Sequence, residues 1–245
     1  MNRILFEPCE VRDGIATFSD VRAEHVLGVL HGEVGQTLKT GIVDGPIGTS
    51  VIERIDGNAV TVRCTHDMPS LPPWIDLVLA PPRPRSMKRL LPQLASLGVR
   101  RIFLVGAEKV EKAFWGAQLL KAEIYRPLLV DGLQQAGTTQ LPTICVSKSF
   151  AHFMKCNFDS TFEGQATRIV AHPYAAETRS QAFHPAFIQG RVPVLAVGPE
   201  GGWTDAELAL LEEKGFERMS LGPRILRTDT ALVALLGILM SLQSS

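Results

Sequence analysis

The chain has 245 residues, 45% of them hydrophobic and 20% charged, which allows one large domain or two modest ones and excludes global disorder. Lysines and arginines number 25, as do aspartates and glutamates, so the formal net charge is zero. This balance counts mildly against a protein dominated by phosphate contacts, although local patches matter more than the total. The sequence has no apolar run of about 18 residues, no apolar signal segment at its N-terminus and no CxxC pair among its four cysteines. We therefore expect a soluble cytoplasmic protein with buried thiols, no membrane span and no metal site.

The first 70 or so residues are typical of short strands around one helix. Residues 11–20 and 49–64 are rich in β-forming residues, and Asp56-Gly57-Asn58 separates two strands as a hairpin turn would. Residues 23–32, AEHVLGVLHG, have the apolar spacing of a short helix. A segment with six prolines begins at Met68, and proline restricts both itself and the residue before it. We predict a small β-barrel over residues 1–72 and a domain boundary near residue 72.

From residue 73 on, strand-like and helix-like segments alternate. The strand-like segments are WIDLVLA (74–80), RIFLVGA (101–107), TICVS (143–147), ATRIVAH (166–172), VPVLAVG (192–198) and FERMSLG (216–222). The helical segments are SMKRLLPQLASLG (86–98), a long stretch ending near Ala136, DAELALLEEKG (205–215) and ALVALLGILMSL (231–242). Pro92 has to lie in the first turn of the first of these helices or kink it. The alternation predicts an α/β domain over residues 73–245, with a mainly parallel sheet covered on both faces.

The turn GPEGGW directly follows the apolar run VPVLAV, which is typical of a central parallel strand. Open α/β sheets bind ligands beyond the carboxyl ends of their strands, and glycine there lets a ligand lie against the backbone. Thr204 with Glu207 has the capping-box spacing, and Gly215 is expected to end the helix. The turn lacks the Lys-Ser/Thr of a phosphate loop, and Glu200 adds negative charge, so a neutral or cationic ligand is favoured over a phosphate.

A second loop, GPRILRTDT (222–230), follows the last strand-like segment. It holds the apolar pair Ile225 and Leu226, bracketed by Arg224 and Arg227. An apolar pair in a loop needs a ligand or a second subunit to cover it. Either loop alone is compatible with an ordinary turn, but the two together favour a binding site.

The segment from Val192 to Leu239 resembles the C-terminal signature of the RsmE-type 16S rRNA uridine N3-methyltransferases, of the SPOUT (trefoil-knotted) class. MNRILFEP, AEHVLGVLHGEVGQTL and AHPYA (171–175) resemble further elements of that family, in order, so the resemblance spans the chain. It implies an N-terminal PUA-like RNA-binding β-barrel (1–72) and a C-terminal SPOUT methyltransferase domain (73–245). It also implies a homodimer, S-adenosylmethionine as cofactor, and 16S rRNA or the small ribosomal subunit as partner.

The resemblance also implies the residues of the site. The cofactor pocket would be lined by residues of both loops: Val197, Gly198, Glu200, Gly201, Gly202, Leu221, Gly222, Ile225, Leu226 and Arg227. Methylation at N3 of uracil places negative charge on O2 and O4, which an arginine would stabilise, and Arg227 and Arg224 are the catalytic candidates. Arg3 and Arg22 are the candidates for RNA contact. His172 is expected either near the methyl donor or as an ordinary residue at a strand end.

The chain departs from the family at several polar and basic positions. Residues 28–31 read GVLH where the family has an RVLR-like run, Gln93 and Ser96 replace a lysine and a glutamate, and Thr138 replaces an arginine. These changes affect RNA contact more than cofactor binding. Two alternatives therefore stay open. One is a differently targeted or non-catalytic RNA-binding relative that keeps the fold, and the other is an enzyme that binds another adenine nucleotide.

Overall fold

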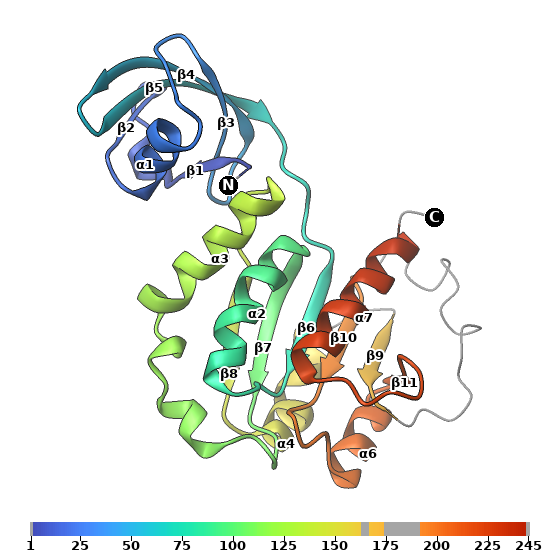
Figure 1. Ribbon diagram of the computed structural model, residues 1–245. Coiled ribbons are helices and arrows are strands. Elements are labelled where there is room, and N and C mark those ends of the chain that lie inside the picture. The colour runs from blue at the N-terminus through green and yellow to red at the C-terminus, as the bar shows by residue number, and fades with distance from the viewer. Residues whose placement is uncertain (1, 163–166, 174–191, 244–245) are drawn as a thin grey trace. The chain divides into compact units, whose positions relative to one another are not determined.

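The chain divides into two compact units in the computed structural model, which describes residues 2–162, 167–173 and 192–243 (Figure 1). The first unit comprises Met1–Pro72 and Arg126–Leu141, and the second comprises Pro73–Tyr125 and Pro142–Ser245. The first break falls at the predicted boundary near residue 72. The sequence places residues 73–245 in one domain, whereas the structure groups Arg126–Leu141 with the first unit.

The first unit is a curled five-stranded sheet with one short α-helix. Its elements are β1 (Ile4–Phe6), η1 (Pro8–Glu10), β2 (Ile15–Phe18), α1 (Val21–Gly28), β3 (Thr37–Ile42), β4 (Ile47–Asp56), β5 (Ala59–Met68) and most of α3 (Ala122–Ala136). The strand order is β1-β3-β4-β5-β2, with β1 and β3 parallel and the other neighbours antiparallel. Because β1 and β2 lie at the two edges, the sheet forms an open half-barrel where the sequence predicted a barrel. The turn between β4 and β5 lies at Gly57, whose φ is +58°, as the hairpin prediction requires.

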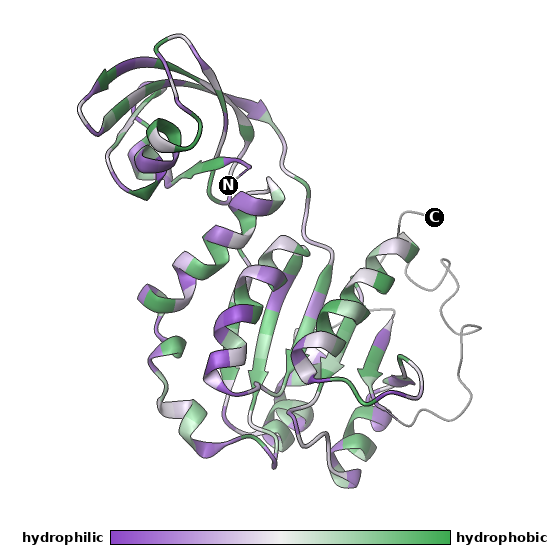
Figure 2. Cartoon of the chain, in the orientation of Figure 1, coloured by the Kyte–Doolittle hydropathy of each residue, from purple (hydrophilic) through white to green (hydrophobic). Residues whose placement is uncertain are grey.

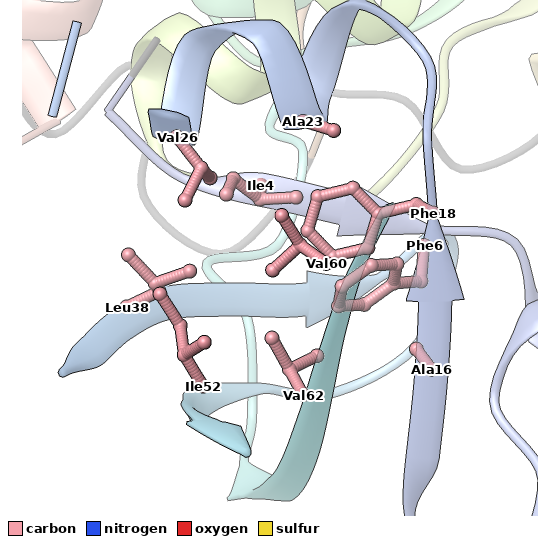
Figure 3. Close-up of a cluster of buried hydrophobic side chains, with 10 residues drawn as sticks. All are labelled: Ile4, Phe6, Ala16, Phe18, Ala23, Val26, Leu38, Ile52, Val60 and Val62. Carbon is pink, nitrogen blue, oxygen red and sulfur yellow. The ribbon is translucent and has the colours of Figure 1, made fainter. Parts of the chain in front are cut away.

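The core of the first unit lies between the concave side of this sheet and α1. Buried and exposed residues alternate along much of β4 and β5, the period of a sheet with one face on a core. Figure 2 shows hydrophilic and hydrophobic residues mixed along these strands. Figure 3 shows ten buried side chains that meet there: Ile4, Phe6, Ala16, Phe18, Ala23, Val26, Leu38, Ile52, Val60 and Val62. The helix begins after Asp20, whose carboxylate accepts a hydrogen bond from the amide of Arg22.

The segment Arg126–Leu141 completes the first unit through hydrogen bonds to its first strands and turns. The backbone amide of Asn2 donates to the carbonyl of Gln134 at 3.1 Å. The fully buried Thr139 donates its hydroxyl proton to the carbonyl of Gly45 at 2.6 Å. The segment therefore satisfies backbone groups that residues 1–72 leave without a partner of their own.

The second unit is a six-stranded parallel sheet with helices. The elements of the second unit are β6 (Ile75–Leu79), α2 (Pro84–Ser96), β7 (Val99–Val105), η2 (Lys112–Gly116), η3 (Gln118–Leu120), β8 (Thr143–Ser147), α4 (Phe150–His152), η4 (Phe153–Asn157), α5 (Phe158–Thr161), β9 (Arg168–Ala171), β10 (Val194–Val197), α6 (Asp205–Glu213), β11 (Glu217–Met219) and α7 (Thr228–Gln243). The strand order is β11-β9-β10-β6-β7-β8, and every neighbouring pair is parallel. In Figure 1, α2 and α7 lie in front of the sheet and α4 lies behind it. The predicted α/β architecture with a parallel sheet is confirmed.

The central strands β6 and β10 are buried along their whole length, as their apolar runs predicted. Asp76 of β6 is fully buried and accepts two hydrogen bonds each from Arg100 and Arg101, at 2.5–3.1 Å. A buried carboxylate is tolerated when it is paired in this way. Helix α2 begins at Pro84 and continues past Pro92, so Pro92 does not lie in its first turn. Among the described residues, no helix is long and apolar enough to cross a membrane.

Candidate functional site

A cavity of about 350 Å³ opens at the carboxyl ends of β9, β10 and β11, which are neighbours in the sheet. Parallel strands end at the same edge of a sheet, so loops that are distant in sequence converge there. The described lining comes from three loops and one helix: residues 171–173, 197–203, 219–222 and 224–226, together with Thr228, Ala231 and Leu235 of α7. The two loops singled out in the sequence therefore share one cavity.

The structure brings together nine of the ten residues predicted to form the cofactor pocket. The nine residues on the cavity wall are Val197, Gly198, Glu200, Gly201, Gly202, Leu221, Gly222, Ile225 and Leu226. Arg227 is not among them. Its side chain is 71% exposed and donates a long hydrogen bond of 3.4 Å to Asp229. Arg224, the other candidate arginine, does line the cavity.

The glycines of these loops are required for two different physical reasons. A Cβ at Gly198 would lie 3.2 Å from the indole nitrogen of Trp203, and a Cβ at Gly201 would lie 2.9 Å from Cδ of Lys109. A side chain at either position would therefore need Trp203 or Lys109 to shift. Gly202 and Gly222 have φ of +69° and +108°, a region that L side chains rarely adopt, and no described atom lies within 4 Å of the place where a Cβ would stand. Their bare backbone faces open space, into which any side chain would project.

Glu200 fastens the glycine turn to the start of α2. Its Oε1 accepts a hydrogen bond of 3.1 Å from the backbone amide of Arg83, the residue that precedes the first turn of α2. A carboxylate is favoured at this end of a helix because the helix dipole is positive there. The side chain of Arg83 bonds in turn to Glu111 at 2.8 Å, and this hydrogen bond raises the pKa of Arg83. These contacts explain why a glutamate occurs among the glycines: Glu200 bonds the turn to the start of α2.

The loop after β7 holds the same turn from the other side. Lys109 donates from Nζ to the carbonyl of Gly201 at 2.9 Å. The amide of Glu108 donates to Oε1 of Glu207 at 2.8 Å, and Oε2 of Glu207 accepts from the amide of Thr204 at 2.9 Å. Thr204 and Glu207 thus form the predicted capping box of α6, and the buried Glu207 also joins two loops.

The opposite wall of the cavity joins the loops after β9 and β11. Ser220 donates its hydroxyl proton to the carbonyl of Pro173 at 3.1 Å. His172 lies on this wall, and the remaining residues of the AHPYA element, 174 and 175, lie outside the described residues. At the mouth of the cavity, Ile225 is 74% exposed and Leu226 is 37% exposed. The apolar pair is therefore open to a ligand or to another chain, as its sequence suggested.

The two arginines predicted to contact RNA are engaged within the first unit. The guanidinium of Arg3 donates hydrogen bonds of 2.6–3.0 Å to three backbone carbonyls of that unit. Arg22 bonds to both Glu10 and Asp20, and its side chain is only 12% exposed. Its hydrogen bonds hold the pKa of each carboxyl below its ordinary value. Both arginines are therefore held by hydrogen bonds within the first unit.

Sequence reasoning missed several residues of the cavity wall. Trp203 packs against Phe150 with ring centroids 5.0 Å apart, and its indole nitrogen is buried without a hydrogen-bond partner among the described residues. Thr228, Ala231 and Leu235 were also missed, although their spacing of three and four residues places them on one face of α7. No group of three side chains suited to bind a metal ion occurs in the part of the chain that the structure describes.

Residues 69–240 match the RNA methyltransferase domain family. Over its whole length, the chain is similar to ribosomal RNA small subunit methyltransferase E of Treponema pallidum, with 34% identity covering 98% of this chain and 91% of that protein. The fold is similar to that of ribosomal RNA small subunit methyltransferase E from Neisseria gonorrhoeae bound to S-adenosyl methionine, with a TM-score of 0.76, 22% identity, and coverage of 99% and 98% of the two chains. It is also similar to a putative methyltransferase from Legionella pneumophila in complex with S-adenosyl methionine, with a TM-score of 0.73, 25% identity, and coverage of 98% and 97%.

Proposed function

This chain belongs to the ribosomal RNA small subunit methyltransferase E family of RNA methyltransferases, and on that premise we propose that it methylates N3 of a uridine in 16S rRNA. The methyl donor is S-adenosylmethionine, which two structural relatives hold. One observation carries the proposal: the loops GPEGGW and LGPRIL, separated in sequence, line the same cavity.

The cofactor lies in this cavity, held by the nine predicted residues that line it. The bare backbone of Gly202 and Gly222 supports this placement, because a ligand that lies against the main chain needs space where side chains would stand. When bound, the sulfonium group supplies a methyl carbon to N3 of the base, its carbon–sulfur bond breaks, S-adenosylhomocysteine leaves, and the N3 proton passes to a base or to solvent. The main contribution of the protein is to hold donor and acceptor in line.

Arg224 and Arg227 differ in how well they are placed to stabilise the charge that develops on O2 and O4 of the base. Arg224 lines the cavity and is our first candidate. Arg227 lies outside the lining and bonds to Asp229, so its side chain has to change rotamer to reach the base. Replacing Arg224 is therefore expected to lower kcat more than replacing Arg227.

The remaining assignments follow from family membership. The first unit is a PUA-like RNA-binding module, the second unit is a SPOUT domain that contains the trefoil knot, and two chains form a homodimer in the cytoplasm, where 16S rRNA is available. The dimer is supported by the exposure of apolar side chains beside the cavity and on α7, with Ile225 at 74% and Ile238 and Met240 at 41% each.

The proposed function is tested by a nucleoside map of 16S rRNA from cells with and without this gene. We expect one 3-methyluridine to disappear on deletion and to return when the purified protein acts on the unmodified small subunits with S-adenosylmethionine. Calorimetry on the purified protein separately tests cofactor binding. A map without any change, together with no detectable cofactor binding, would contradict the proposal.

A second candidate is a non-catalytic RNA-binding relative. It is favoured by the loss of the family's polar and basic positions at residues 28–31, Gln93 and Thr138. It predicts an unchanged methylation map with intact binding to small subunits, and so the same experiment separates the two candidates.

A further inference from the structure

The positive charge of the second unit is concentrated in one stretch of sequence. Between Asp76 and Glu108 the chain carries six arginines and lysines and no acidic residue. Arg100 and Arg101 of this stretch pair with the buried Asp76. The other four lie at the start of α2 and are exposed: Arg83, Arg85, Lys88 and Arg89.

Three of these side chains form one face of α2. Arg85, Lys88 and Arg89 are spaced by three and four residues, so they project from the same side of the helix. Met87 and Leu90 turn toward the sheet and are buried. Figure 2 shows hydrophilic residues on the side of α2 that faces away from the sheet. We call Arg85, Lys88 and Arg89 the basic face of α2.

The charge of this face is only partly compensated within the chain. Arg89 bonds to Asp229 at 3.3 Å, in an exposed pair. For Arg85 and Lys88, the described residues provide no ion-pair partner within 4 Å. The positive end of the α2 dipole lies at the same place, where the carboxylate of Glu200 offsets part of it.

Two hydrogen bonds place this face beside the cavity. The amide of Arg83, two residues before Arg85, donates to Glu200, which is part of the cavity wall. Arg89 bonds to Asp229, the neighbour of the wall residue Thr228. A polyanion lying along the basic face would therefore pass close to residues of the cavity wall.

We propose that the basic face of α2 binds the phosphate backbone of the substrate RNA beside the target nucleotide. The inference rests on the proposed function and extends it. A base that enters the cavity has to leave its stack, and the phosphates that flank it remain outside, where cations are needed to hold them. The basic face also supplies positive charge that the chain lacks at residues 28–31, Gln93 and Thr138. The zero net charge of the whole chain conceals this concentration.

The test compares two double variants that each remove two exposed positive charges from the second unit. Arg85→Gln with Lys88→Gln alters the basic face, whereas Lys121→Gln with Lys155→Gln serves as the matched control. The probes are deproteinised 16S rRNA and small ribosomal subunits from cells without the gene, each titrated at several salt concentrations. Melting temperature and calorimetric affinity for S-adenosylmethionine are measured for every variant.

We expect the basic-face variant to bind both probes about tenfold or more weakly at 0.1 M salt. The slope of log affinity against log salt should fall by about 1.5, because two phosphate contacts are lost. The control should resemble the wild type, and cofactor affinity and melting temperature should stay unchanged in both. A variant that swaps the two residue types and keeps both positive charges, Arg85→Lys with Lys88→Arg, should largely preserve RNA binding.

Equal RNA affinity of the two double variants would overturn the proposal, since the effect would then be one of net charge. A loss seen with small subunits but absent with naked rRNA would also overturn it, in favour of contact with a ribosomal protein. If the wild type neither binds the cofactor nor transfers a methyl group, the proposed function fails, while a selective loss of rRNA binding in the basic-face variant would still support the RNA surface.

Discussion

At Gly201, the absence of a side chain leaves room for Lys109, which belongs to the loop after β7. The methylene chain of Lys109 occupies the space where a Cβ would stand, and Nζ of the same lysine bonds to the carbonyl of Gly201. At Gly202 and Gly222, by contrast, φ is positive and no described atom lies within 4 Å of the place of a Cβ, and both residues line the cavity. The glycines that looked alike in the sequence therefore divide into a pair with close neighbours, Gly198 and Gly201, and a pair with positive φ and open space, Gly202 and Gly222.

We predict that Gly201→Ala weakens S-adenosylmethionine binding by about fivefold, because the added methyl displaces Lys109 and one hydrogen bond of roughly 1 kcal/mol is lost. In a Lys109→Ala background the same substitution meets no lysine side chain, so its effect should be smaller. Calorimetry on the four proteins of this double-mutant cycle measures the coupling. Additive effects would show that Lys109 and the turn do not act together.

The position of a residue could be inferred where the local sequence determines it, and the partner of a side chain could not be inferred where that partner is distant in sequence. The loop residues 197–202 follow a buried strand, so their place at a sheet edge could be inferred from sequence. The sequence around Arg3 does not indicate that its guanidinium bonds to the carbonyl of Gly137, 134 residues further on. A single arginine has the same appearance in sequence whether it binds phosphate or a carbonyl of its own fold.

Among the elements, α6 shows how one helix start organises the site. Its capping box was readable from the sequence, because Thr204 and Glu207 are three residues apart. The sequence could not reveal that Glu207 also accepts the amide of Glu108, since that contact depends on how β7 and β10 are ordered in the sheet. The capping residue Glu207 therefore also links the loop after β7 to the loop after β10.

We predict that Glu207→Ala destabilises the protein by about 1–3 kcal/mol, because two part-buried backbone amides lose their acceptor. Thermal unfolding measures the loss, and cofactor affinity should fall in parallel. Glu212→Ala on the same helix is the control, since its exposed pair with Arg218 should contribute less than about 1 kcal/mol. Equal effects of the two substitutions would remove any special role for Glu207.

Strand periodicity and apolar runs were sufficient to predict the elements of the parallel sheet. Helix α2 was harder, because proline propensity argues against a helix through Pro92, and the burial of Leu90, Leu91 and Leu94 overrides it. The short helices α4, η4 and α5 were not predicted, since segments of three to five residues carry too few turns to show a period.

For the whole molecule, the two units contain different ionisable clusters and should respond differently to acid. In the first unit, His66 Nε2 lies 2.8 Å from the hydroxyl of the buried Thr40. Burial lowers the pKa of His66, and the charge of Arg3 lowers it further, while Asp67 opposes the shift. The unfolded chain therefore binds the proton more readily than the folded one, so this contribution to stability is complete above pH of about 6.5 and is lost as the pH falls below it.

We predict that acidification from about pH 7.5 to 5.5 lowers the stability of the first unit and that His66→Asn reduces this dependence. All three tryptophans, Trp74, Trp115 and Trp203, belong to the second unit, so their fluorescence reports that unit alone. Hydrogen exchange of β3–β5 amides reports the first unit. Identical acid responses of the two signals, or an unchanged response in the variant, would contradict the assignment to His66.

The discontinuity of the first unit has a consequence for biosynthesis. Its sheet emerges early from the ribosome, yet the carbonyl of Gln134 and the hydroxyl of Thr139, which bond to Asn2 and Gly45 next to the strands, are translated only after Pro73–Tyr125. The nascent half-barrel therefore lacks its last segment, Arg126–Leu141, while Pro73–Tyr125 of the other unit is being synthesised. Its last segment ends at Leu141, so the first unit can reach its native state only after Pro73–Tyr125 has been made, but before the second unit is completed at Ser245.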